Sequence, residues 1–200
     1  MKPEKLVSRC VEMGIDCIAI TDHNTIDGAL AVQSTASIRV IVGEEIKSRG
    51  GEITGLFLQE TVPSELSPLE TVQRIKGQGG LVSIPHPFDH FRRSVINRQA
   101  LQQILPYVDI IEAFNARNTF QRDNEAALAL ALQHDILISS VSDSHTSLEV
   151  GRSYVETPDF DHRPLALMEA LSRGRLVRRP ITPLIHLVTT LTKIRKHLIG

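Results

Sequence analysis

Imidazole and carboxylate side chains follow short apolar runs at several separate places in this sequence. The residues concerned are Asp22 with His23, Glu45, His86, and Asp143 with His145. An apolar run that ends in such residues is typical of a buried strand that leaves a sheet at the edge of a cleft. We therefore expect these side chains, although far apart in the sequence, to meet at one end of a sheet.

The chemistry open to such a group is metal binding. It offers imidazole nitrogen and carboxylate oxygen but no thiolate, a donor set that suits divalent Mn, Zn or Fe. The candidate metal ligands are His23, Glu45, His86, Asp143 and His145. Five ligands exceed the need of one tetrahedral ion, and a carboxylate among histidines can bridge two ions that activate a water and bind a phosphoryl group. A lone histidine is more often an ordinary surface or core residue, so the hypothesis rests on their recurrence at strand ends.

Strands and helices alternate along the chain. Predicted strands cover 15–20, 38–46, 53–58, 81–84, 108–114, 136–141 and 154–157, and predicted helices cover 3 to about 14, 25–36, 68 to between 77 and 80, 98–105, 118–134, 164–171 and 183–198. The pattern Ser67-Pro68-Leu69-Glu70 indicates a capping box, and Gly50-Gly51 indicates a hairpin turn. The alternation predicts a parallel barrel or a doubly wound sheet. Ligands after many different strands favour the barrel, because all its strands end at one mouth.

The composition is that of one soluble globular domain, with 200 residues of which 42% are hydrophobic and 22% charged. The formal net charge of -1 does not imply nucleic acid as a partner. No apolar run approaches the length of a membrane span and no signal peptide is evident, so we expect a cytoplasmic protein with no membrane contact. Cys10 and Cys17 lack the spacing of a disulfide framework or a thiolate zinc site, and we expect both in the core.

Four segments, in order, resemble motifs of the PHP (polymerase and histidinol phosphatase) family of metal-dependent phosphoesterases. They are 14–25 with its Thr-Asp-His-Asn-Thr run, Gly43-x-Glu45-Ile46, His86-Pro87 and Ser142-Asp143-Ser144-His145. The resemblance implies a distorted (β/α)7 barrel with a two- or three-metal centre that hydrolyses phosphoesters. It implies a PHP domain over 1–160, with 161–200 as a helical extension packed on the barrel.

The resemblance also implies roles for individual residues. Glu45 would be the bridging carboxylate among the five metal ligands, and Asp22 would support His23. Asp22, His23 and Asp143 would form the catalytic set. Asn115 takes a position where some members have another histidine, so the third ion is left open. Asn115 and Arg117 would then face the substrate, with Arg117 either a phosphate clamp or an ordinary surface residue.

The sequence departs from the family pattern at its start. Members open with a strand that carries His-x-His, and this chain has no histidine before His23. Either the chain as given is truncated, or it is a degenerate member that lacks two ligands. We favour truncation because the remaining ligands are intact.

Together these observations predict a hydrolase that uses a metal-activated water to attack a phosphoester of a small phosphorylated metabolite or nucleotide. The rival enzyme is an amide or lactone hydrolase of the amidohydrolase type, although no lysine ends a predicted strand as its carboxylated bridge. The non-enzymatic alternative is a binding or interaction module without catalysis. His90, Arg92 and Arg93 follow His86-Pro87 and either line the cleft or form a solvated loop, of which we favour the loop. The sequence gives no indication of oligomeric state.

Overall fold

A computed structural model describes residues 1–181 of the chain. The helices are α1 (Pro3–Glu12), α2 (Asp27–Gln33), α3 (Pro68–Gly77), α4 (Arg98–Ile104), the 3-10 helix η1 (Leu105–Tyr107), α5 (Gln121–Gln133) and α6 (Pro164–Ser172). The strands are β1 (Cys17–His23), β2 (Arg39–Ser48), β3 (Gly51–Leu56), β4 (Leu81–Ile84), β5 (Ile110–Asn115), β6 (Leu137–Val141), β7 (Tyr154–Glu156) and β8 (Arg175–Val177). The predicted helix 183–198 lies outside the described residues.

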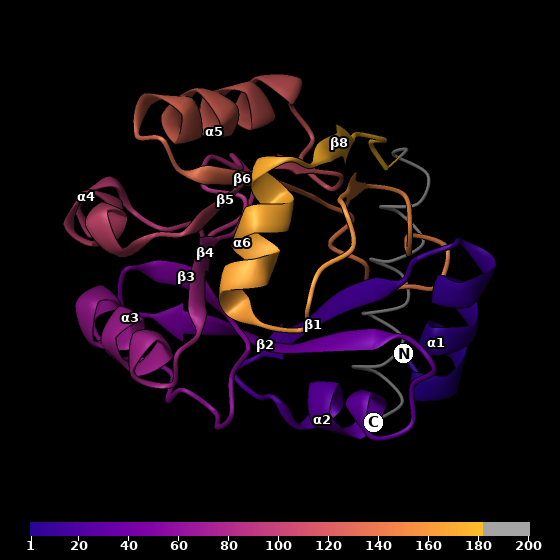
Figure 1. Cartoon of the computed structure of the whole chain (residues 1–200). Helices are drawn as coiled ribbons and strands as arrows, with labels where there is room; N and C mark the ends of the chain where they lie inside the picture. The colour runs from indigo at the N-terminus through magenta and orange to yellow at the C-terminus, as the bar shows by residue number, and fades with distance from the viewer. Residues whose placement is uncertain (182–200) are drawn as a thin grey trace, which may run out of the picture.

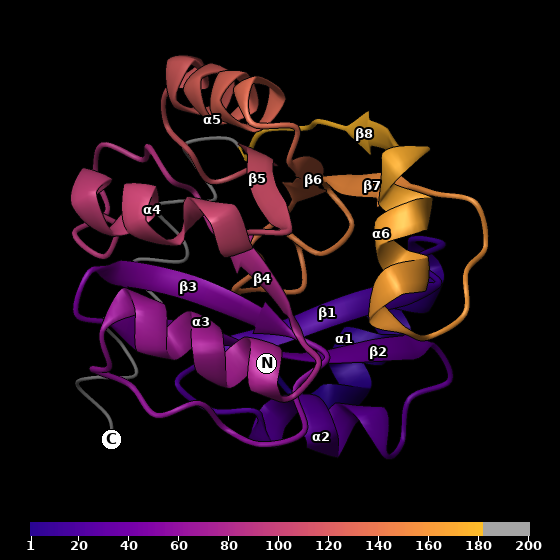
Figure 2. The same ribbon diagram turned by 60° about the vertical axis from the view of Figure 1, so that its left-hand side comes forward.

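One six-stranded sheet forms the centre of the fold, with its strands in the order β1-β2-β3-β4-β5-β6. Neighbouring strands pair in parallel, except that β3 runs antiparallel to β2 and to β4. The sheet curls into a half-barrel with β1 and β6 as its outer strands (Figures 1 and 2). Its consecutive order differs from a doubly wound sheet, in which the strand order reverses. The mixed α/β class and the barrel-like order are confirmed, but the described strands do not close into the predicted seven-stranded barrel.

The two faces of the sheet bury different sets of residues, because side chains alternate along a strand. The outer face packs against α2, α3, α4 and α5 around Val42, Ile46, Ile53, Ile84 and Ile111. The inner face carries Ile41, Leu56, Leu81 and Ile110 at one end, where Leu167 of α6 packs against them. Residues 45, 52 and 112 follow the same alternation and also belong to the inner face. The inner face is therefore apolar under α6 and acidic beyond it.

Helix α3 begins where the sequence predicted, at a capping box. Ser67 Oγ accepts a hydrogen bond from Glu70 N at 3.3 Å, and Glu70 Oε2 accepts one from Ser67 N at 3.0 Å. Pro68 occupies the first turn, where its missing N–H leaves no donor unsatisfied. The buried face of α3 ends in Ile75, which is fully buried against the sheet.

The hairpin between β2 and β3 is also confirmed, and it depends on Gly51. This residue has φ +122, and a Cβ placed there would lie 2.3 Å from Ile96 Cα. Only glycine fits such a backbone conformation against another chain segment. The turn therefore reverses β3 beside β2 and brings Glu52 back toward the carboxyl end of β2.

The segment after β6 holds an antiparallel pair that the sequence revealed only in part. Strand β7 was predicted, whereas its partner β8 was not. Ser140 Oγ of β6 donates to Val177 O at 2.7 Å and ties the pair to the main sheet. Strand β8 lies in a segment with several arginines, and only its pairing with β7 identifies it as a strand. The described part of the predicted extension, 161–181, thus contains α6 and β8, and its separation as a unit stays a prediction.

Both cysteines are free thiols, as predicted, with Cys10 fully buried and Cys17 half-buried. Burial raises the pKa of both, and it raises that of Cys17 to about 11. Within residues 1–181, none of the helices has the length and apolar character that crossing a bilayer requires. The cytoplasmic location stays a prediction.

Ser67→Ala is expected to destabilise the protein by about 1 kcal/mol, because the orphan N–H of residue 70 at the start of α3 loses its acceptor. Urea denaturation followed by circular dichroism measures the loss. Ser64→Ala, in the exposed loop before the helix, is the matched control. Equal stability losses for the two variants would contradict the capping role.

Alkylation of Cys17 by iodoacetamide is expected to accelerate with pH up to 9.5 without reaching a plateau. The thiolate is the reactive form, and its fraction rises about tenfold per pH unit below a pKa near 11. Peptide mass spectrometry gives the rate for this cysteine alone. The same measurement in denaturing urea serves as the control, and there the rate levels off near pH 9. A plateau at that pH in the folded protein would show that the thiol is not desolvated.

Candidate metal centre

Four neighbouring strands bring imidazoles and carboxylates to one place on the inner face. Parallel pairing of β1 with β2 sets His23 opposite Glu45, and β4 ends just before His86. Strand β3 contributes Glu52, which lies diagonal to Glu45 because Glu45 pairs with Thr54. We call His23, Glu45, Glu52 and His86 the His–Glu cluster.

Glu45 lies between the two imidazoles of the cluster. Its Oε2 is 3.1 Å from His23 Nδ1, and its Oε1 is 3.1 Å from His86 Nε2. Glu52 is close to the same nitrogens, with Oε1 3.7 Å from His23 Nδ1 and Oε2 3.6 Å from His86 Nε2. His86 and Glu52 are buried, while the side chain of His23 is 56% exposed. The cluster therefore opens to solvent at His23.

Asn24, which follows the first predicted ligand, fixes the end of β1. It has φ +56, a left-handed conformation that asparagine tolerates better than most residues. Its Oδ1 accepts from Lys47 N at 2.9 Å, and its own N donates to Glu45 O at 3.1 Å. These two bonds hold the carboxyl end of β1 against β2, so His23 stays beside Glu45.

The electrostatics of the cluster favour a positive charge within it. Burial, and then the neighbouring charge of Glu45, raise the pKa of Glu52. Burial lowers the pKa of His86, but the hydrogen bond to Glu45 and the charges of Glu112 and Glu45 outweigh it, so this pKa lies above its usual value. Two half-buried or buried carboxylates on one face repel each other unless a proton or a cation lies between them.

The cluster fits a divalent metal ion by geometry as well as by charge. One ligand atom each from His23, Glu45 and Glu52 lies within 4.8 Å of the others. His86 Nδ1 is buried without a hydrogen-bond partner among the described residues. Nitrogen and carboxylate donors without thiolate suit Zn, Mn or Fe, and metal binding would displace the proton that the acidic surroundings favour.

Asp143 and His145, the ligands predicted after β6, lie together in a second group. Asp143 Oδ2 accepts from Asn115 Nδ2 at 3.2 Å and from Arg92 Nη2 in a short contact. His145 Nδ1 is 3.0 Å from Asp143 O and 3.6 Å from Asp143 Oδ1. Burial would raise the pKa of Asp143, but Arg92 and His145 hold it below its usual value. Asp143 is thus ionised and already faces a cationic side chain.

Glu112 of β5 joins the second group to the His–Glu cluster. Its Oε2 accepts from His86 N and from Asn115 Nδ2, each at 3.0 Å. Burial raises the pKa of Glu112 to about 7. Glu112 and Glu52 were not predicted as site residues. The sequence signal for Glu112 was a single charged residue within the apolar run of β5. The signal for Glu52 was its position after the hairpin, and its proximity to Glu45 follows only from the register between β2 and β3.

Two predicted site residues lie elsewhere. Asp22 is exposed and faces away from His23 along β1, with its Oδ2 against Gly28 at the start of α2. Arg117 is largely buried and pairs through Nη1 with Glu149 Oε1 at 2.5 Å. Neither side chain contacts the two groups in this structure, so their catalytic and substrate roles stay predictions.

Glu149 is fully buried and organises the loop that carries His145. Its Oε2 accepts from His145 N at 2.8 Å, from Thr146 N at 2.7 Å and from Thr146 Oγ1 at 3.0 Å. Its other oxygen binds Arg117. The ion pair therefore connects the end of β5 to the loop after β6 and sets the position of His145.

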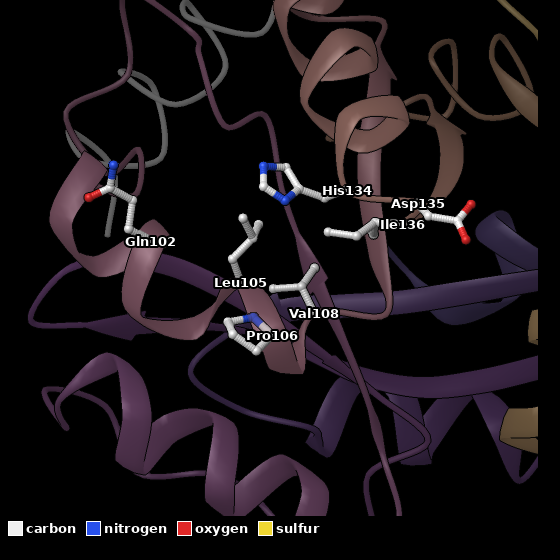
Figure 3. A pocket seen from close by; sticks show the side chains of 7 residues that line it. All are labelled: Gln102, Leu105, Pro106, Val108, His134, Asp135 and Ile136. Carbon is white, nitrogen blue, oxygen red and sulfur yellow. The ribbon is translucent and has the colours of Figure 1, made fainter.

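A cavity of about 390 Å³ lies at the opposite end of β5 and β6 (Figure 3). Its lining residues are Gln102, Leu105, Pro106, Val108, His134, Asp135 and Ile136. Val108 and Ile136 precede their strands, whereas Asn115 is the last residue of β5 and Asp143 follows β6. The cavity thus contains none of the predicted ligands, and the chemistry of the site does not depend on it.

Comparison with known proteins places this arrangement in a family. A family model described as PHP-associated matches residues 121–176. The fold is similar to a two-domain protein of Bacteroides vulgatus that contains a predicted PHP-like metal-dependent phosphoesterase, with a TM-score of 0.68 and 18% identity over 88% of this chain and 60% of that chain. The family-model match and the shared fold both support the PHP family for this chain.

Other proteins are similar to this chain in fold or in sequence. The lesion-specific endonuclease PfuEndoQ of Pyrococcus furiosus has a similar fold, with a TM-score of 0.59 and 12% identity over 86% of this chain and 52% of that chain. Two uncharacterized proteins of Methanocaldococcus jannaschii are closer in sequence: MJ0417 is 36% identical over 80% of this chain, and MJ1587 is 38% identical over 58%. The chain spans 66% of the length of MJ0417 and 67% of that of MJ1587.

Glu149→Gln is expected to lower the free energy of unfolding by about 3 kcal/mol or more, because it leaves the Arg117 guanidinium buried without its counter-charge. Chemical denaturation measures the change. Glu125→Gln, on the exposed face of α5, is the control and should stay within about 0.5 kcal/mol of the wild type. A loss at Glu149 no larger than this would show that the pair is not a structural link.

Proposed function

We propose that this PHP chain is a metal-dependent phosphoesterase, with the His–Glu cluster as the core of its metal centre. The observation that carries the proposal is the convergence of His23, Glu45 and His86 at the ends of three strands, joined by Glu52 from a fourth. We expect a (β/α)7 barrel with two or three divalent ions, of which Mn, Zn and Fe fit the donors. Asp143 and His145 complete the ligand set.

The residues around the centre have separate tasks in this proposal. Bound divalent ions supply a water of lowered pKa and stabilise charge on phosphoryl oxygens. Glu45 lies between His23 and His86, and its carboxylate is therefore suited to bridge two such ions. Glu112 accepts hydrogen bonds from the backbone N of His86 and from the amide of Asn115. It therefore orients His86 in the His–Glu cluster and the amide that contacts Asp143 in the second group. Asn115 lies at the boundary between the groups, and its amide donates to both Glu112 and Asp143, so a substrate oxygen would bind this amide by displacing one of the two acids.

The substrate class that fits best is a phosphorylated metabolite or nucleotide. Some relatives of similar fold, such as the endonuclease of P. furiosus, act on nucleic acid. The net charge of -1 gives this chain no overall attraction for a polyanion. A small phosphoester, attracted only by local charge at the site, is therefore the preferred substrate.

Replacing a cluster residue is expected to weaken metal binding and to abolish phosphoester hydrolysis without unfolding the protein. Isothermal titration with Mn²⁺ should show affinity losses of about 10- to 100-fold or more for His23→Ala, and hydrolysis of p-nitrophenyl phosphate should be lost in both His23→Ala and Asp143→Ala. His134→Ala, at the remote cavity, is the matched control and should behave as the wild type. Hydrolysis retained in His23→Ala would refute the assignment of the centre.

A further inference from the structure

The loop after β4 places a guanidinium at the site, although the sequence favoured a solvated loop there over one that lines the cleft. The side chain of Arg92 is 21% exposed. Its Nε donates to Asp89 Oδ2 at 3.0 Å, and its Nη2 donates to Asp143 Oδ2. Arg92 thus extends from the segment that follows His86 to the acid that follows β6.

Asp89 holds this guanidinium in a defined orientation. It is buried, its N donates to His86 O at 3.1 Å, and its Oδ1 accepts from Phe91 N at 2.9 Å. The carboxylate is therefore fixed by its own loop before it binds Arg92. A side chain oriented by a fixed partner loses less conformational entropy when it binds a ligand.

The surroundings of Arg92 are acidic. Asp143, Asp89 and Glu45 lie near enough to act on its charge, and a dianionic phosphoester would be repelled by these acids without a positive charge at hand. The other arginine predicted for this task, Arg117, is engaged by Glu149. Arg93, the sequence neighbour of Arg92, is exposed to solvent. Of these three arginines, Arg92 is the one whose guanidinium contacts a predicted metal ligand, Asp143.

We propose that Arg92 binds the phosphate group of the substrate, the task that the sequence suggested for Arg117. The guanidinium has five N–H donors, of which Asp89 and Asp143 use two, and the remaining donors match phosphate oxygens in a planar fork. Asp89 keeps Arg92 in place, while the bond to Asp143 is exchanged for bonds to the phosphate. This proposal rests on the proposed function and names the residue that recognises the anionic part of the substrate.

The test is the binding of inorganic phosphate to the Mn²⁺-loaded protein, measured by isothermal titration. Arg92→Gln should weaken phosphate binding at least tenfold, because a charge-assisted, two-point contact is lost. Arg93→Gln removes the same charge from the next residue and should stay within twofold of the wild type. Arg92→Lys keeps the buried positive charge but not the planar fork, and its affinity should lie between the two.

A second measurement separates recognition of phosphate from support of the fold. Mn²⁺ affinity without phosphate, and the thermal midpoint, should be no lower in Arg92→Lys than in the wild type. Phosphate affinity that is equal in Arg92→Gln and Arg93→Gln, or absent in the wild type, would overturn the proposal. A parallel loss of metal affinity, stability and phosphate binding in both Arg92 variants would also overturn it, since Arg92 would then be structural.

The outcome for Arg92 is distinguishable from the outcome for the proposed function. If the wild type binds phosphate through Arg92 but releases none from p-nitrophenyl phosphate, the phosphoesterase proposal fails and the role of Arg92 stands. If the wild type hydrolyses the ester and Arg92→Gln leaves KM unchanged, the role of Arg92 fails and the phosphoesterase proposal stands.

Discussion

The contact on which the site depends is the carboxylate of Glu45 between the imidazoles of His23 and His86. It is 3.1 Å from each, and a second carboxylate, Glu52, lies beside it on the same face. Two acids this close in a partly buried place are stable only with positive charge between them. The two imidazoles lie against these acids in this structure, and a divalent ion held by the same donors would supply the positive charge. The strands must hold these groups together against their mutual repulsion.

The topology of the sheet explains how the strands do so. In a parallel barrel each strand contributes the residues at its carboxyl end. Strand β3 runs the other way and contributes its amino end, so the tight hairpin at Gly51 places a second acid next to Glu45 within a few residues of chain. At the other end of the inner face, Leu167 and its apolar neighbours close the core. The division between an apolar and an acidic end leaves the ligands accessible and the scaffold rigid.

The sequence predicted the parts of this structure that local patterns determine. The capping box at Ser67, the hairpin, most elements of the alternation and the convergence of His23, Glu45 and His86 follow from spacing and residue type. Residues whose role depends on pairing between distant segments could not be found in this way. Glu52 required the β2–β3 register, Arg92 required the position of a loop without periodicity, and the burial of Arg117 required its pairing with Glu149, which lies 32 residues away. The half-barrel closure also depends on long-range geometry that no local pattern contains.

Several residues with a Cβ adopt left-handed backbone conformations, and three of them lie at the site. His86 and Asp143 adopt φ +30 and φ +47, and Asn24 adopts φ +56. Left-handed conformations of residues with a Cβ cost roughly 1 kcal/mol or more each, and glycine would adopt them with less strain. A chain selected only for thermostability would exchange these side chains for glycine and lose the imidazole and the acid. At His86 and Asp143 the turn therefore keeps an imidazole and a carboxylate in a backbone conformation that glycine would adopt with less strain.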